Sequence, residues 1–290
     1  MLIDLHIHSK TCSDGNLSVS EIIKEAKTRK INFISITDHD SIACQKQAMT
    51  LAQQNQIHYI NGIELNITFR HPDFCNSKSS SLDLLGYNFD ITNRALLDKL
   101  EQINKYRKKR VTKILEKLNT EFEKEEREKL TKDDLTKIQD SADGVLGRPH
   151  IADYLVKKRI VNDRKEAFNK YLVKCNVPKY PLYIEEATNL LKNAGGLAVL
   201  AHPNDPYGTS LVNLTNSLQE QTRIIKNSLL EYIDGIECWH SRNDHETTTH
   251  YVKFSKRNNL IMTGGSDCHQ KPIIMGTVDV PDFVAQQLFK

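Results

Sequence analysis

Seven apolar segments along the chain have the length and composition of β-strands. They are "LIDLHIH" (2–8), "FISITD" (33–38), "HYINGIEL" (58–65), "LDLLGYNF" (82–89), "GLAVLAH" (196–202), "DGIECWH" (234–240) and "LIMTGGSD" (260–267). Segments with apolar residues at helical spacing separate most of them, over residues 18–30, 41–54, 184–196 and 245–259. This alternation predicts an α/β fold in which parallel strands are covered by helices.

One long stretch interrupts the alternation. Residues 96–179 contain no convincing strand and consist of charged helical sequence, closed by "NVPKYP". We therefore predict a helical insertion over 96–179 within an α/β domain formed by 1–95 and 180–290. The basic run "KYRKKR" (105–110) could contact nucleic-acid phosphates or form a solvated helix face, and the acidic "EKEERE" that follows weakens the nucleic-acid interpretation.

Composition narrows the class of protein. The chain has 290 residues, 39% hydrophobic and 27% charged, which suits a soluble globular domain with an insert. No apolar run reaches the roughly 18 residues of a membrane span, and polar residues stand where a signal peptide would need an apolar core. Six scattered cysteines favour reduced thiols. We expect a cytoplasmic protein without membrane contact, and the sequence indicates no obligate protein partner.

The first predicted strand carries Asp4, His6 and His8 on one face, with Leu5 and Ile7 on the other. Residues two apart on a strand lie roughly 6.6 Å apart, so both imidazoles could bind one metal ion. A half-solvated edge strand with polar residues outward would explain the same pattern. A His-x-His pair alone is weak evidence for a metal site.

Residues that can bind metal also stand at the ends of four other predicted strands. They are Asp38, His39, Asp40, Glu64, His202, Asp267 and His269. Asp38 could instead cap the next helix, and His202 could simply close a strand. In a barrel of parallel strands these ends share one rim, so their joint occurrence predicts a metal site there. Imidazole and carboxylate without thiolate suit Zn²⁺, Mn²⁺ or Fe²⁺, and their number suggests more than one ion.

Five motifs carry a family resemblance. "DLHIHSKTCSDG", "ITDHD", "GIE", "AHP" and "GSDCH", in this order, resemble the PHP (polymerase and histidinol phosphatase) family of metal-dependent phosphoesterases. The resemblance runs from residue 1 to about 277 and implies a distorted (β/α)7 barrel. The segment "LGRPHIADYLV" (146–156) and its surroundings resemble the branch with nucleoside 3′,5′-bisphosphate phosphatases and a 5′→3′ exoribonuclease acting on short RNA.

The resemblance also implies two or three divalent metal ions and their ligands. The implied ligands are His6, His8, Glu64 and Asp267 for the first ion, Glu64 and His202 for the second, and Asp14, His39 and His269 for the third. Asp4, Asp38 and Asp40 match family positions that orient the ligands.

The sequence departs from the family pattern at Asp83. Relatives usually carry a histidine before the "LLGY" run, where it completes the second metal site, and this chain has Asp83. A carboxylate ligand in place of an imidazole favours Mn²⁺ or Fe²⁺ over Zn²⁺. We therefore expect the second ion to be labile.

The expected reaction is hydrolysis of a phosphate ester, in which metal ions activate water and neutralise the phosphoryl oxygens. Arg148 and His150 would bind a phosphate, or His150 would protonate the leaving oxygen. The alternative is that "RPH" merely starts a helix, with Pro149 in its first turn. Trp239 and His240 could stack on a base, or Trp239 could be a core residue.

The expected substrate is a small phosphorylated molecule, either a nucleotide such as a 3′,5′-bisphosphate or the 5′ end of short RNA. Histidinol phosphate and a DNA 3′ end are alternatives within the same chemistry. A metal-stabilised domain that binds without turnover is an alternative of another class, and the intact ligand set argues against it.

Overall fold

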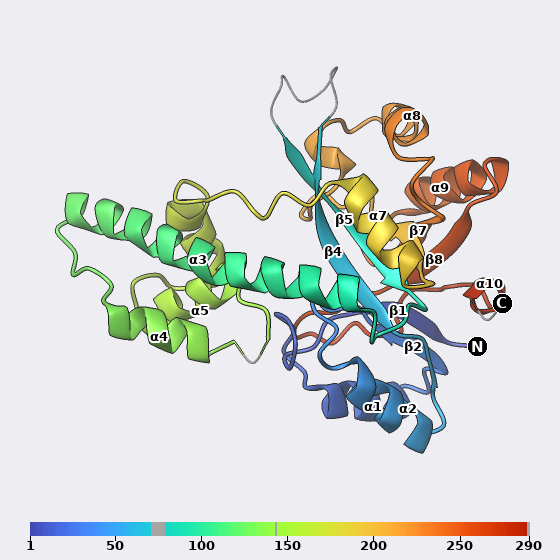
Figure 1. Ribbon diagram of the computed structural model, residues 1–290, viewed down its shortest axis with the longest axis horizontal. Helices are drawn as coiled ribbons and strands as arrows, with labels where there is room; N and C mark the ends of the chain where they lie inside the picture. Colours follow the sequence, from blue (N-terminus) through green and yellow to red (C-terminus); the bar gives the residue numbers. More distant parts are fainter. Residues whose placement is uncertain (71–78, 143, 289–290) are drawn as a thin grey trace.

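The computed structural model describes residues 1–70, 79–142 and 144–288, and its strands form two sheets (Figure 1). The strands are β1 (Ile3–Ile7), β2 (Phe33–Ile36), β3 (His58–Tyr59), β4 (Gly62–Phe69), β5 (Ser80–Tyr87), β6 (Leu197–Leu200), β7 (Gly235–His240) and β8 (Ile261–Gly265). One sheet has the order β1-β2-β3 and the other β4-β5-β6-β7-β8. The α/β class is confirmed, and the strand predicted over 58–65 is divided between β3 and β4.

The prediction that all strands run parallel is wrong for β5. This strand is antiparallel to both β4 and β6, whereas β1, β2 and β3 are mutually parallel, as are β6, β7 and β8. Only residues 70–79 join β4 to β5, and a parallel pair needs a crossover of about a dozen residues or more. The connection is therefore too short to return the chain to the same end of the sheet.

Two isolated bridges connect the two sheets. Ile7 at the end of β1 forms a parallel bridge to Cys268 beyond β8, and His39 beyond β2 forms one to Glu64 in β4. The approach is close: a Cβ on Gly265 would lie 2.4 Å from the backbone nitrogen of His6. These contacts bring the ends of β1, β2 and β8 and the first residues of β4 to one place.

Helices cover the sheets as the sequence predicts. They are α1 (Val19–Thr28), α2 (Gln45–Gln54), α7 (Ile184–Asn193), α8 (Leu218–Ser228), α9 (His245–Arg257) and α10 (Phe283–Leu288). A capping box formed by Ser18 and Glu21 starts α1, which buries its apolar face. α8, which Ser217 caps, was not among the helices predicted from the sequence. No helix in the described ranges is long and apolar enough to cross a membrane.

The insertion packs around a hydrophobic cluster of its own, to one side of the sheets (Figure 1). It contains α3 (Arg94–Lys124), α4 (Lys132–Asp140), α5 (Arg148–Lys157), α6 (Arg164–Ala167) and a π-helical turn, η1 (Phe168–Leu172). Ile114, Leu118 and Phe122 of α3 are fully buried in this cluster. The division of the chain at residues 95 and 179 stays a prediction.

Candidate metal centre

Two histidines at the end of β1 form the floor of the candidate site. The Nε2 atoms of His6 and His8 lie 3.1 Å apart, and both side chains are buried. Every residue of β1 is buried, which rules out the half-solvated edge strand. Because His6 and His8 stand two positions apart, the pleat turns both imidazoles to the same side.

Glu64 of β4 lies at the centre of the histidines. Its Oε1 is 2.9 Å from Nε2 of His202 and 3.5 Å from Nε2 of His6. Its Oε2 is 2.8 Å from Nδ1 of His39 and 3.3 Å from Nε2 of His8. One carboxylate thus contacts four imidazoles through two oxygens, an arrangement that allows it to bridge two ions.

Asp267, which follows β8, likewise contacts several imidazoles. Its Oδ1 lies 3.3 Å from Nε2 of His6, from Nε2 of His8 and from Nδ1 of His269. Asp14, which follows β1, places its Oδ1 3.5 Å from Nε2 of His269. Residues in or directly after five strands, β1, β2, β4, β6 and β8, and one residue of the loop after β1 therefore form one continuous cluster.

Three groups of side chains in this cluster have ligand atoms close enough to share an ion. They are His6, His8 and Asp267; His6, Glu64 and His202; and His8, Asp14, His39 and His269. These groups coincide closely with the three ligand sets implied by the family resemblance, so the structure brings the predicted residues together. Their role as ligands stays a prediction.

Asp83 belongs to none of the three groups. Its Oδ1 accepts a 2.5 Å hydrogen bond from Nδ2 of Asn66, and its Oδ2 accepts one from the hydroxyl of Thr209. Its Oδ2 lies 3.9 Å from Nε2 of His202, beside the second group. Both carboxylate oxygens thus have partners within the protein, consistent with a second ion that is held less tightly.

The donor set fits divalent cations. Oε2 of Glu64 and Oδ1 of Asp267 are buried and accept no well-formed hydrogen bond from the described residues, although imidazole nitrogens lie within 3.3 Å. A buried carboxylate oxygen without a partner is costly, and a cation would satisfy it. Two other groups, Cys12–Asp38–Cys44 and Asp205–His240–Asp267, are explained by protein contacts, since Cys44 donates to Asp38 and Arg242 pairs with Asp205.

The electrostatics of the cluster show what a cation would replace. Burial alone would lower the pKa of His8, but Asp267 and Glu64 outweigh it and raise that pKa to about 10. Burial alone would likewise lower the pKa of His202, but Glu64 raises it to about 9. Burial raises the pKa of the Glu64 carboxyl, but His39 and His6 lower it well below its usual range. In the absence of metal, the direction of these shifts favours protonated imidazoles at His8 and His202, which would balance the carboxylates as metal ions would.

Sequence reasoning missed Glu237 of β7. Its Oε1 lies 3.0 Å from Nδ1 of His6, and its Oε2 accepts a 2.8 Å hydrogen bond from the backbone N–H of His202. A carboxylate on the far nitrogen of a ligating histidine fixes its tautomer and orientation. The acidic residue inside the apolar run "DGIECWH" was the available signal.

The three predicted orienting carboxylates hold backbone rather than imidazoles. Asp4 accepts hydrogen bonds from the backbone N–H and hydroxyl of Ser266, next to Asp267. Asp38 likewise accepts from the backbone N–H and hydroxyl of Ser9, next to His8. Each therefore fixes a segment that carries a candidate ligand.

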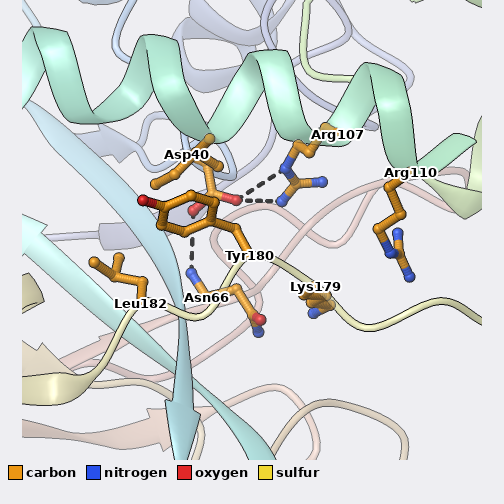
Figure 2. Close-up of a pocket in the computed structure, with 8 residues that line it drawn as sticks. Asp40, Asn66, Arg107, Arg110, Lys179, Tyr180 and Leu182 are labelled. Atoms are coloured by element: carbon orange, nitrogen blue, oxygen red, sulfur yellow. Dashed lines mark hydrogen bonds and ion pairs between the residues drawn. The ribbon is translucent and has the colours of Figure 1, made fainter.

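Asp40, next to His39, connects this centre to the insertion (Figure 2). Nε of Arg107, on α3, lies 3.0 Å from Oδ2 of Asp40, and Nη2 also contacts that oxygen. Oδ1 of Asp40 accepts a hydrogen bond from the backbone of Asn66, whose side chain reaches Asp83. Asp40 has a φ of +48°, a left-handed conformation that is uncommon for an aspartate and that these contacts hold in place.

A cavity of about 630 Å³ lies over the cluster. Candidate ligands, including Asp14, Glu64 and His202, line it. It is also lined by five cations, here called the cationic wall: Arg107, Arg110, Arg148, Arg164 and Lys179. Figure 2 shows Arg107 and Arg110 on α3 and Lys179 on the chain after η1. Burial, together with the nearby Arg148 and Arg107, lowers the pKa of Arg110 to about 10. This volume suits a small-molecule ligand, and the cations suit a phosphate.

Arg148 and His150 have different surroundings. Arg148 lines the cavity, and its guanidinium lies 5.3 Å from the ring centroid of Phe168. His150 is not among the described residues that line the cavity; its Nδ1 accepts a 3.2 Å hydrogen bond from the N–H of Gly147 at the start of α5. Burial lowers the pKa of His150. The helix-start explanation thus fits His150 better than Arg148.

Trp239 and His240 are separated by their alternation along β7. The ring of Trp239 packs edge-on against Phe283 at 5.8 Å, as a core residue would. His240 is buried, with Nε2 3.6 Å from Asp267. Both line a second cavity of about 400 Å³, and the described lining of the larger one includes neither.

A family model named PHP domain matches residues 4–240, which include most of the cluster. The chain belongs to the PHP domain family. Among curated relatives of this PHP-domain protein, a 5′-3′ exoribonuclease from Haemophilus influenzae is 31% identical over 211 residues, 69% of this chain and 68% of its own length. A 3′,5′-nucleoside bisphosphate phosphatase from Chromobacterium violaceum is 27% identical and covers 92% of this chain and 87% of its own length.

Two solved structures resemble this PHP domain over nearly its whole length. One is described as a metal-dependent phosphoesterase from Bifidobacterium adolescentis, with 25% identity and a TM-score of 0.79 over 99% of this chain and 95% of that one. The other is an amidohydrolase from Chromobacterium violaceum with bound sulfate and no metal, with 25% identity and a TM-score of 0.80 over 100% of this chain and 96% of that one. The chain is therefore a metal-dependent phosphoesterase of the PHP type and a hydrolase.

Glu237→Gln should weaken metal binding by about 10- to 100-fold while the fold is retained, because the neutral amide no longer supports the basicity of His6. Competition with a chelating dye would measure metal affinity, and circular dichroism the fold. Glu185→Gln, at an exposed site on α7, is the control and should leave affinity unchanged. Equal affinities for Glu237→Gln and the unchanged protein would contradict the role of Glu237.

The free energy of unfolding of the metal-free protein should fall as the pH rises from about 7 to 10. His8 and His202 have pKa values of about 10 and 9 in the folded protein, and ordinary values near 6.5 apply once it unfolds. In this range the folded state binds more protons, so its advantage is lost as the pH rises. Urea titrations of chelator-treated protein would measure this, and His8→Gln should show a smaller pH dependence. An unchanged dependence in that variant would refute the explanation.

Proposed function

We propose that this protein hydrolyses a phosphate ester of a nucleotide, either a monoester of a nucleoside 3′,5′-bisphosphate or the phosphodiester at the 5′ end of a short RNA. The observation that carries the proposal is the cluster of buried carboxylates and imidazoles at the floor of a cavity that the cationic wall also lines. Metal ligands next to a row of arginines and a lysine suit a substrate that is anionic at its reacting group and elsewhere.

The proposed ligands are those of the three groups, with Asp83 completing the second. They would hold two or three Mn²⁺, Fe²⁺ or Zn²⁺ ions, and the carboxylate of Asp83 favours the first two. Bound there, the ions would supply Lewis-acid polarisation of the phosphoryl group and activation of a water molecule. The two bridges between the sheets support a distorted (β/α)7 barrel as the framework of this site.

The wall of the insertion supplies substrate binding. Arg148 offers a planar fork suited to two parallel hydrogen bonds with a phosphate dianion. Lys179 faces the same cavity from the chain after η1, and burial lowers its pKa. Asp83 and Asp40 both act to raise that pKa, but Asp40 is already paired with Arg107. A second phosphate of the substrate would therefore neutralise charge that the protein leaves unbalanced.

The names of the relatives support this substrate class. The Haemophilus influenzae protein is named for action on RNA, and the Chromobacterium violaceum protein for action on a nucleoside bisphosphate. The sulfate bound in the Chromobacterium violaceum structure resembles a phosphate group in charge and shape. A second candidate, histidinol phosphate, has one phosphate and would leave the cationic wall unused.

Purified protein loaded with Mn²⁺, Fe²⁺ or Zn²⁺ should hydrolyse adenosine 3′,5′-bisphosphate and short 5′-phosphorylated RNA, and should lose this activity after chelation. Histidinol phosphate and p-nitrophenyl phosphate complete the panel. His8→Ala should abolish turnover and release at least one equivalent of metal, measured by elemental analysis. Bound metal without hydrolysis of any substrate would instead indicate a binding domain.

Arg148→Ala should lower kcat/KM on adenosine 3′,5′-bisphosphate by about 10- to 150-fold, the value of a charge-assisted contact to phosphate. p-Nitrophenyl phosphate has no second phosphate, so its hydrolysis should suffer much less. Arg127→Ala, on the insertion and paired with Glu125, is the control. Equal losses on both substrates would mean that Arg148 contacts the reacting phosphate or stabilises the fold. No loss on either substrate would mean that Arg148 only begins α5.

A further inference from the structure

An exposed tyrosine stands at the cavity, on the loop after β6. The side chain of Tyr207 is 85% exposed, yet the residue lines the same cavity as the candidate metal ligands. The other large apolar side chains exposed in the described ranges are Met1, Met49, Val173, Tyr183 and Phe283, and this cavity's described lining includes none of them. An aromatic face left open beside a binding site can take a ring from a ligand.

The backbone of Tyr207 is fixed by a buried carboxylate. Its N–H donates a 2.9 Å hydrogen bond to Oδ1 of Asp205, and the N–H of Asp205 donates to the carbonyl of His202 at 3.0 Å. Oδ2 of Asp205 accepts a 2.5 Å hydrogen bond from Arg242. Asp205 thereby ties the tyrosine to a candidate metal ligand on one side and to an arginine on the other.

The loop is fixed on the far side of the tyrosine as well. The hydroxyl of Thr209 donates to Asp83, beside the second ligand group. The amide of Asn213 donates to the carbonyl of Gly208 at 3.2 Å, and Ser210 donates to the carbonyl of Asp205. Tyr207 is therefore the open tip of a loop whose two ends are hydrogen-bonded at the metal centre.

Arg242 decides which face of the ring is free. Its Cζ lies 5.5 Å from the centroid of the Tyr207 ring. A second ring between them would need about 3.5 Å on each side, roughly 7 Å in all. A ligand ring must therefore stack on the outer face, with the guanidinium behind the tyrosine as a fixed cation.

We propose that Tyr207, supported by Arg242, is the platform on which the nucleobase of the substrate stacks while its phosphate lies at the metal centre. This inference rests on the proposed function and names the part of the substrate that the loop recognises. Tyr207 takes the role considered for Trp239, which packs against Phe283 instead. Stacking uses the face that every base possesses, so the platform accepts all four bases.

The test compares two substrates that differ only in the base. They are adenosine 3′,5′-bisphosphate and an analogue in which hydrogen replaces the adenine. Tyr207→Ala should lower kcat/KM on the adenosine substrate by about 5- to 150-fold, mainly through KM, as expected for one stacked base. Tyr207→Ala should hydrolyse the base-free analogue at nearly the rate of the unchanged protein. Tyr207→Phe, which keeps the ring, should restore kcat/KM on the adenosine substrate.

Tyr183→Ala is the matched control, because Tyr183 is also exposed and has Arg70 over its ring at 6.0 Å, away from this cavity. This variant should leave kcat/KM unchanged on both substrates. Equal losses on both substrates in Tyr207→Ala would overturn the proposal, because the loop would then act only by supporting Asp83 and His202. No loss on the adenosine substrate would overturn it as well.

A binding measurement separates this inference from the proposed function. If the unchanged protein hydrolysed neither substrate, the proposed function would fail, and fluorescence of a 2-aminopurine nucleotide would still report stacking. Quenching by the unchanged protein that is lost in Tyr207→Ala and kept in Tyr207→Phe would support the platform. Absent quenching, or equal quenching in Tyr207→Ala, would refute it.

Discussion

The burial of Glu64 and Asp267 among histidines is the constraint on which the rest of the structure depends. Carboxylates taken out of water are costly unless cations compensate them. Each one contacts several imidazoles, and Glu237 adds a third buried carboxylate behind His6. These residues come from both sheets, so the charges can be balanced only where the sheets meet. The bridges from Ile7 to Cys268 and from His39 to Glu64 lie at this place.

The insertion is coupled to this centre through side chains rather than through the sheets. Arg107 on α3 binds Asp40, Asp40 binds the backbone of Asn66, and Asn66 binds Asp83. Arg107 also reaches the carbonyl of Leu146, two residues before Arg148. A helix outside the α/β domain therefore fixes one end of the cationic wall and, through three hydrogen-bonded residues, the carboxylate beside the second ligand group.

The sequence indicated which side chains gather in the cluster, because the two-residue period of a strand places His6 and His8 on one side and His202 and Asp267 follow parallel strands. Glu64 joins them from near the start of β4 rather than from a strand end. Their role as ligands stays a prediction. The sequence could not predict partners that depend on distant contacts. Glu237 lies in an apolar run, and Arg107 lies in a run of cations of which only some face the cavity. The direction of β5 was missed because strand periodicity carries no direction. Trp239 and Tyr207 could be distinguished only by what packs against each ring.

In the proposed function, the floor and the cationic wall of the cavity perform separate tasks. All phosphate monoesters share the same reacting group, so the metal ligands cannot distinguish one substrate from another. Discrimination must come from groups that contact the rest of the molecule, since only their contacts differ between substrates. In this chain the groups proposed for that task belong to the insertion and to the loop after β6. Both are anchored to the metal centre, by Arg107 and by Asp205 respectively. A change in either segment can therefore alter the choice of substrate while the chemistry at Glu64 and Asp267 stays the same.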